Sequence, residues 1–138
     1  MTLAPNTHIY LNPDGVLLDK HVRPVQCLHE FLAHITTHHQ CTWLTSHVID
    51  DNTNHVLKHL KNNGVPEETL ALAAKINGTT WKFLRTDAIN FDEPFLWFED
   101  MPTSGELQVL EEHQAKENLI WVDRVSGTSL CEWLKTNG

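Results

Sequence analysis

The chain has 138 residues, of which 41% are hydrophobic and 20% are charged, an ordinary balance for a single globular domain over residues 1–138. Its formal net charge of −8 argues against broad, non-specific affinity for nucleic-acid backbones. No apolar run approaches the roughly 18 residues that a membrane-spanning helix needs, and the N-terminus lacks a signal-peptide pattern. Three dispersed cysteines favour reduced thiols, and we therefore expect a cytoplasmic location: Cys27, Cys41 and Cys131.

Strand-like and helix-like segments alternate from start to end. Four segments have the composition and length of buried strands: 9–11, 41–45, 94–98 and 119–122. Apolar residues at helical spacing predict four helices. The first starts near Pro24, and the second contains residues 56–60 and ends at Asn63-Gly64. The third follows a cap at Thr103 or Ser104, and the fourth contains residues 130–134. A short helix is expected after Trp81-Lys82. Residues 67–76 fit a helix by propensity and a strand by alternation.

Continuous apolar strands interleaved with amphipathic helices predict an α/β fold with a parallel sheet covered on both faces. In such sheets the functional crevice lies beyond the carboxyl ends of the strands. Polar residues gather at these predicted ends: Asn12-Pro13-Asp14-Gly15, Thr45-Ser46, Glu99-Asp100 and Asp123, with Lys82 before a helix between them.

These residue types match phosphoryl transfer through an aspartate nucleophile. That chemistry needs a nucleophilic carboxylate, a second carboxylate to protonate the leaving oxygen, a hydroxyl and an ammonium for the phosphate, and acidic ligands for Mg²⁺. The chain supplies every part except the nucleophile, with Asp14, Thr45, Lys82, Glu99 and Asp100. Asn12 stands where the nucleophilic aspartate is expected.

With these motifs the chain resembles the haloacid dehalogenase (HAD) superfamily of phosphatases. The four motifs of that family are matched in order by Asn12-Pro13-Asp14-Gly15-Val16-Leu17, Trp43-Leu44-Thr45-Ser46, Lys82 and Leu96-Trp97-Phe98-Glu99-Asp100. The resemblance is closest to the small capless HAD domains of RNA-repair ("Swiss Army Knife") proteins. It includes an asparagine after the second motif, here Asn52, and a late turn, here Gly127-Thr128-Ser129-Leu130.

The resemblance implies a Rossmann-like three-layer α/β/α sandwich with a mostly parallel five-stranded sheet, in which Leu70–Ala74 is the third strand, and no cap domain. It implies that Asp14 is the general acid and base and that its backbone carbonyl reaches the metal. Thr45 would bind the transferring phosphate, and Lys82 would offset negative charge. The Mg²⁺ ligands would come from Asn12, Asp14, Asp100 and, more weakly, Glu99.

Asn12 separates the functional hypotheses, because an amide is a far poorer nucleophile than a carboxylate. The first hypothesis is a Mg²⁺-dependent phosphohydrolase in which Asn12 suppresses turnover and whose open site suits a phosphorylated macromolecular substrate or one that brings its own lid. If Asn12 was introduced to trap phosphate, the parent protein is an active enzyme. The second is a pseudo-enzyme that binds phosphorylated ligands. The third is a partner-binding domain with a vestigial site. A structural role is expected for Asp123.

Ten histidines raise the separate question of a zinc site. His29 and His34 are one residue too far apart for the HExxH zinc helix. His55 and His59 stand four residues apart on a predicted helix, but the sequence offers no third ligand beside them. These histidines are therefore expected on helix surfaces.

Overall fold

A four-stranded parallel sheet forms the centre of the protein. The computed structural model describes residues 4–45, 52–81, 83–122 and 127–138. Its strands are β1 (His8–Leu11), β2 (Cys41–Trp43), β3 (Phe95–Glu99) and β4 (Leu119–Trp121), in the order β2-β1-β3-β4. All three pairings are parallel, and Leu11 pairs with Trp43 on one side and Phe98 on the other. The carboxyl ends of the two central strands, β1 and β3, therefore meet at one edge.

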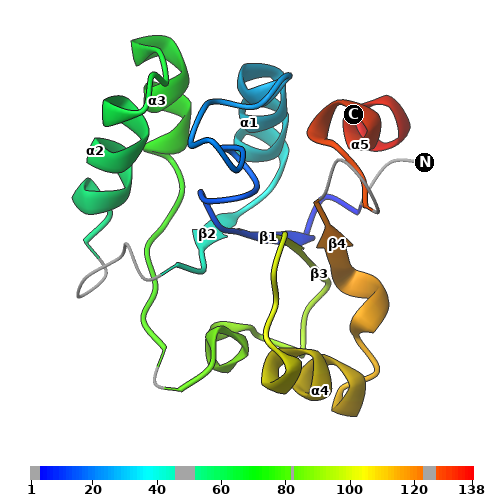
Figure 1. Ribbon diagram of the computed structural model, residues 1–138. Helices are drawn as coiled ribbons and strands as arrows, with labels where there is room; N and C mark the ends of the chain where they lie inside the picture. Colours follow the sequence, from blue (N-terminus) through cyan, green and yellow to red (C-terminus); the bar gives the residue numbers. More distant parts are fainter. Residues whose placement is uncertain (1–3, 46–51, 82, 123–126) are drawn as a thin grey trace.

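Helices cover both faces of this sheet (Figure 1). One face carries α1 (Leu28–His38), α2 (Asn54–Asn62), α3 (Glu67–Ala73) and α5 (Leu130–Asn137). The other carries α4 (Ser104–Glu112) with the 3₁₀ helices η1 (Arg85–Ala88) and η2 (Lys116–Asn118). The predicted α/β class with a parallel sheet is confirmed, and the arrangement is compatible with a Rossmann-like fold.

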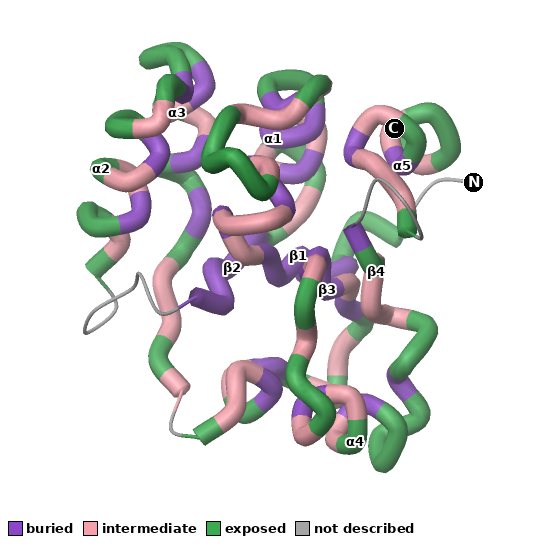
Figure 2. Tube along the Cα trace, viewed as in Figure 1, coloured by how far each residue is buried: buried purple, intermediate pink, exposed green. Residues whose placement is uncertain are grey.

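Each face of the sheet packs a core of its own. Successive strand residues point to opposite faces, so Ile9 and Leu11 join the core beneath α1, whereas Tyr10 joins the core beneath α4. The strands β1, β2 and β3 are buried almost throughout, whereas the edge strand β4 is partly exposed and ends at the exposed Trp121. Most other exposed residues lie on the outer surfaces of the helices and on loops (Figure 2). Burial on both faces explains why the strands read as continuous apolar runs.

The third strand expected at Leu70–Ala74 is wrong, because these residues lie in and directly after the helix α3. Thr69 and Ala73, four residues apart, are both buried, so the helical period decides the conformation over the strand-like alternation. The sheet of the described residues has four strands instead of five. Isolated parallel bridges add one residue at each edge, Asn77 beside Thr42 and Thr128 beside Val122.

The boundaries of several helices follow local signals. Thr103 caps α4 as predicted, since its hydroxyl accepts a hydrogen bond from the Glu106 amide at 3.1 Å. Gly64, with φ of 94°, follows the end of α2 as expected. Pro24 does not start α1, which begins at Leu28. Instead, Pro24 forms an antiparallel bridge with Leu18.

A disulfide joins Cys27, before α1, to Cys131 in α5. The expectation of three reduced thiols is therefore wrong for this pair, while Cys41 is free and buried. The two cysteines are 104 residues apart in sequence, and only the packing of α5 against α1 makes them neighbours. Separately, no helix in the described ranges is long and apolar enough to cross a membrane.

Loss of this disulfide should destabilise the fold. A cross-link that closes a loop of this length removes much of the conformational freedom of the unfolded chain, so the Cys131→Ser variant should lose about 2–4 kcal/mol of unfolding free energy. Urea denaturation with and without reductant measures the effect. Reductant should lower the midpoint of the wild type and leave that of the variant unchanged. Equal midpoints for oxidised wild type and variant would contradict a stabilising cross-link.

Candidate functional site

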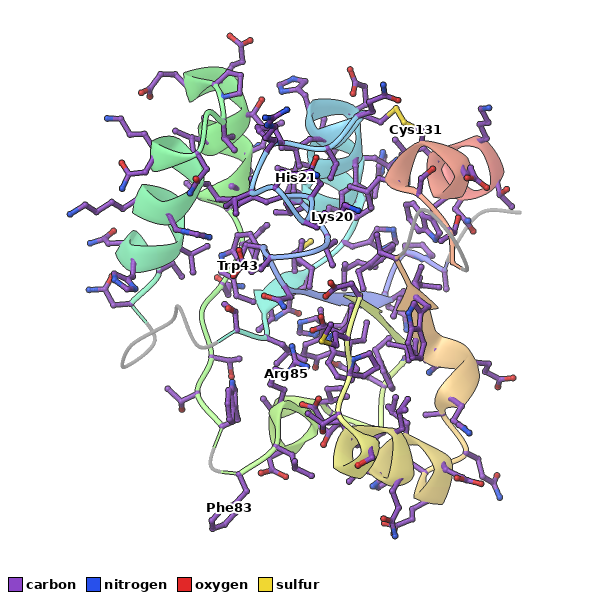
Figure 3. All side chains as sticks on the ribbon, viewed as in Figure 1. Lys20, His21, Trp43, Phe83, Arg85 and Cys131 are labelled. Atoms are coloured by element: carbon purple, nitrogen blue, oxygen red, sulfur yellow. A yellow bond between two sulfur atoms is a disulfide. The ribbon has the colours of Figure 1, made fainter. Side chains whose placement is uncertain are left out.

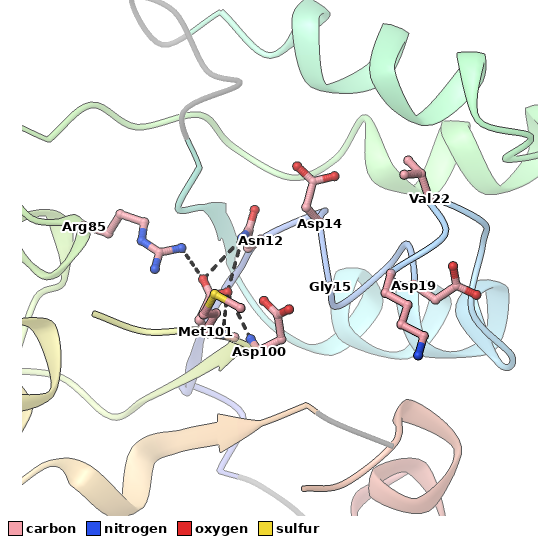
Figure 4. Close-up of a pocket in the computed structure, with 10 residues that line it drawn as sticks. Asn12, Asp14, Gly15, Asp19, Val22, Arg85, Asp100 and Met101 are labelled. Atoms are coloured by element: carbon pink, nitrogen blue, oxygen red, sulfur yellow. Dashed lines mark hydrogen bonds and ion pairs between the residues drawn. The ribbon is translucent and has the colours of Figure 1, made fainter. Parts of the chain in front are cut away.

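A tight turn after β1 shapes the candidate site. The Pro13 carbonyl accepts hydrogen bonds from the amides of Leu17 and Leu18, both at 3.0 Å, and the Gly15 amide donates to the Leu18 carbonyl at 2.8 Å. The turn leaves a pocket of about 350 Å³ at the carboxyl ends of β1 and β3 (Figure 4). Its lining includes four of the predicted site residues, Asn12, Asp14, Glu99 and Asp100.

Gly15 allows the ends of β1 and β3 to approach each other closely. Its φ of 80° lies in the left-handed region, which side chains with a Cβ rarely adopt. A Cβ at this position would also collide with the carboxylate of Asp100. The Asp14-Gly15 sequence is therefore more than a generic turn signal, because glycine is what lets Asp100 lie beside the loop that carries Asp14.

The Asn12 amide is oriented by Glu99. Its Nδ2 donates to both carboxylate oxygens of Glu99 at 3.3 Å (Figure 4). Its Oδ1 is buried and has no hydrogen-bond partner among the described residues. Because an unsatisfied buried oxygen is costly, Oδ1 is a position where a bound cation or donor would be stabilised.

Arg85 links Glu99 to α4 and was not predicted from the sequence. The guanidinium forms an ion pair with Glu99 and a bidentate pair with Glu106, with Nε–Oε2 and Nη2–Oε1 distances of 2.9 Å. Glu106 also accepts from the Thr103 amide in the capping box of α4. Arg85 thus lies between the sheet and the α4 layer and reaches toward the end of β1 (Figure 3). Nothing in the local sequence distinguishes it from a surface arginine.

The pKa values of the two carboxylates bound by Arg85 shift in opposite directions, although both groups are buried. Burial raises the pKa of Glu99 to about 7, and a hydrogen bond with the side chain of Asp100 acts in the same direction, whereas the charge of Arg85 opposes both. Burial also opposes ionisation of Glu106, but hydrogen bonds from Arg85 and the Thr103 amide outweigh it and lower the Glu106 pKa. Glu99 is therefore the acid of this network that gains a proton most readily near neutral pH.

Asp14 contacts a histidine that the sequence placed on a helix surface. His59 of α2 lies with Nε2 2.8 Å from Asp14 Oδ1. The side chains retain 24% and 50% of their exposure, so the contact borders the open side of the pocket. The spacing of His55 and His59 identified a helix face correctly, but a contact between residues 14 and 59 requires the tertiary fold.

The remaining predicted site residues either lie outside the pocket lining or are not among the described residues. Thr45 is buried just after β2 and does not line the pocket. Asn52 is exposed, and its Oδ1 accepts from the Asn54 amide at the start of α2. Lys82 and Asp123 lie outside the described residues.

A groove continues from the pocket toward α5. This groove of about 680 Å³ shares five lining residues with the pocket: Gly15, Asp19, Lys20, Asp100 and Met101. Lys20 and His21 lie on its border, on the loop after β1 (Figure 3). Met101 is exposed at the mouth. The pocket is thus open along one side, with room for a ligand larger than a phosphate group.

The pocket offers few oxygen donors for Mg²⁺. Within the described residues no group of three or more His, Cys, Asp or Glu side chains is arranged to hold a metal. Mg²⁺ does not require one, since it is usually held by one or two carboxylates together with waters and substrate phosphate. Asn12, Asp14 and Asp100 all line one pocket, and the buried Oδ1 of Asn12 has no hydrogen-bond partner among the described residues, so this set fits that pattern.

Comparisons with models of protein families, with curated proteins and with solved structures gave no significant match. We therefore infer the function from the geometry of the pocket and from the resemblance of the sequence motifs to those of the HAD superfamily.

Proposed function

We propose that the pocket is a Mg²⁺-dependent phosphohydrolase site of the HAD type, in which Asn12 replaces the nucleophile and suppresses turnover. The observation that carries the proposal is that Asn12, whose buried Oδ1 has no hydrogen-bond partner among the described residues, lines the same pocket as Asp14 and Asp100. A ligand oxygen, a general acid and a second carboxylate are thereby grouped at the end of the central strands, where α/β sheets bind ligands. The natural ligand would be a phosphorylated molecule that reaches the pocket through the open groove.

The charge of the pocket supports a requirement for a cation. Four acidic residues line it, Asp14, Asp19, Glu99 and Asp100, against two basic ones, Lys20 and Arg85. Arg85 is already paired with Glu99 and Glu106, so its charge is largely compensated within the protein. A phosphate dianion would be repelled by the remaining carboxylates unless a divalent cation neutralised them.

The roles of the side chains follow from their positions. Asn12 Oδ1 and Asp100 would hold Mg²⁺, together with the backbone carbonyl of Asp14. Glu99 is engaged by Asn12, Arg85 and two backbone amides, which favours Asp100 as the carboxylate ligand. When bound, Mg²⁺ supplies charge neutralisation for the phosphoryl group. Asp14 would give a proton to the leaving oxygen and, with a carboxylate at position 12, would later take one from water.

A second candidate function is a phosphate-binding pseudo-enzyme. It is favoured by the fit of the amide to its surroundings, because Asn12 donates to a carboxylate that an aspartate at this position would repel. Both candidates share the same binding step and differ in whether a restored carboxylate produces turnover.

Binding of inorganic phosphate to the chain as it stands should require Mg²⁺. Calorimetric titration in MgCl₂ should give an affinity at least about tenfold higher than titration in EDTA, a difference of about 1.4 kcal/mol. The Asp100→Asn variant should lose most of this enhancement because it removes a proposed ligand of the cation. The Asp92→Asn variant is the matched control, since Asp92 is exposed and lies outside the pocket lining.

Two results would refute the binding proposal. One is phosphate affinity that is the same in MgCl₂ and EDTA. The other is an equal loss of affinity in the Asp100→Asn and Asp92→Asn variants, which would indicate an effect of surface charge instead of a site.

A further inference from the structure

His59 approaches the pocket from an element that carries no predicted motif. It lies in the last turns of α2, between Val56 and Leu60, which are buried and fix this side of the helix against the core. The helix thereby places the imidazole of His59 with Nε2 2.8 Å from Asp14 Oδ1. The helix α2 and the turn after β1, to which Asp14 belongs, meet in this contact.

The surroundings of the imidazole indicate which nitrogen carries its proton. Asn63 Nδ2 donates to the His59 carbonyl at 2.8 Å and lies 3.5 Å from His59 Nδ1. Because an amide nitrogen can only donate, this contact favours the tautomer in which Nδ1 accepts and Nε2 carries the hydrogen. His59 Nε2 is then the donor to Asp14 Oδ1.

We propose that His59 is a positioning residue that fixes the orientation of the Asp14 carboxylate at the border of the pocket through the Nε2–H···Oδ1 hydrogen bond. With Oδ1 accepting from His59, a proton carried by Asp14 resides on Oδ2, which is the oxygen that serves the leaving group. The catalytic part of this inference rests on the proposed phosphohydrolase site, whereas the hydrogen bond itself does not.

An NMR measurement on the chain as it stands tests the hydrogen bond without any turnover. Imidazole N–H protons exchange rapidly with water unless they are hydrogen-bonded, so the wild type should give an observable Nε2–H signal for His59. The signal should disappear in the Asp14→Ala variant and persist in the Asp100→Asn variant. An absent signal, or one unaffected by Asp14→Ala, would overturn the proposal even if the phosphohydrolase site is correct.

Kinetics in the Asn12→Asp background test the consequence for catalysis. His59→Leu should lower kcat by roughly 10- to 100-fold with little change in KM, because a loosely held acid is misplaced in the transition state. The loss should be larger for alkyl phosphates than for nitrophenyl phosphate, whose leaving group needs less protonation. His59→Gln, which keeps a donor near the position of Nε2, should recover most of the rate. His55→Gln on the same helix is the control.

The outcomes separate the two proposals. Equal rates for the His59→Leu and His59→Gln variants, or a loss independent of the leaving group, would overturn the positioning role. An inactive Asn12→Asp protein with an intact, Asp14-dependent His59 signal would refute the phosphohydrolase function and retain the contact between His59 and Asp14.

Discussion

Replacement of Asn12 by aspartate should convert a nearly inactive chain into a Mg²⁺-dependent phosphatase. The change puts a carboxylate at the position from which the amide now contacts Glu99, within the pocket that also contains Asp14 and Asp100. Loss of a nucleophile costs many orders of magnitude in enzymes that depend on one, so we expect a gain on the order of 10³-fold or more in kcat/KM. Release of p-nitrophenol from nitrophenyl phosphate measures it.

The surroundings of position 12 explain why the gain should depend strictly on Mg²⁺. Aspartate would face the carboxylate of Glu99, which now accepts from the Asn12 amide at 3.3 Å. The ion pair with Arg85 and the raised pKa of Glu99 relieve part of the repulsion between these two groups. A phosphate dianion would still enter a pocket lined by Asp14 and Asp100, where a divalent cation offsets the added negative charge. EDTA should therefore abolish the new activity, and Asn12→Asp combined with Asp14→Asn should abolish it as well. A double variant as active as Asn12→Asp alone would remove Asp14 from the mechanism.

Replacement of Arg85 by methionine should strongly destabilise the fold. Arg85 is the cation between two acids that are almost completely buried, Glu99 at 1% exposed and Glu106 at 2%. Methionine keeps much of the volume but removes the counter-charge that Arg85 gives to both carboxylates, and loss of one partner costs about 3–5 kcal/mol in comparable buried pairs. The free energy of unfolding from urea denaturation at pH 8 measures the loss.

The pH dependence of this variant provides a second check. Without Arg85 the acids would be protonated more readily, so the variant should lose less stability at pH 5, where neutral carboxyls are tolerated, than at pH 8. Arg23→Met is the matched control, because Arg23 is exposed. A loss below about 1 kcal/mol for Arg85→Met at pH 8 would show that the network contributes little, as exposed ion pairs do.

Local patterns in the sequence are sufficient to predict the four observed strands and the edge of the sheet at which the pocket forms, but not the absence of a strand at Leu70–Ala74. The apolar runs around Ile9 and Trp97 are buried on both faces of the sheet, and this burial produces a continuous signal. The cap at Thr103 and the glycine after α2 are predictable as well, because each acts on helix-end groups within a few residues of itself.

The rest depends on contacts between distant residues. His59 meets Asp14 across 45 positions, Arg85 meets Glu106 across 21, and Cys27 meets Cys131 across 104. The neighbouring sequence does not reveal any of these pairs, because a charged or thiol side chain has the same local sequence context on a surface as in a buried pair. The helix α3 was misread because its apolar residues are compatible with both periods, and the burial of Thr69 and Ala73 decides between them.

A crystal structure of the unmodified chain with MgCl₂ and tungstate, an electron-rich analogue of phosphate, tests the central claim most directly. We predict a cation in contact with Asn12 Oδ1 and Asp100, and the oxyanion beside it in the pocket that Asp14 lines. The account would be contradicted by a pocket that contains neither ion at saturating concentrations, or by tungstate bound only at other positions on the surface.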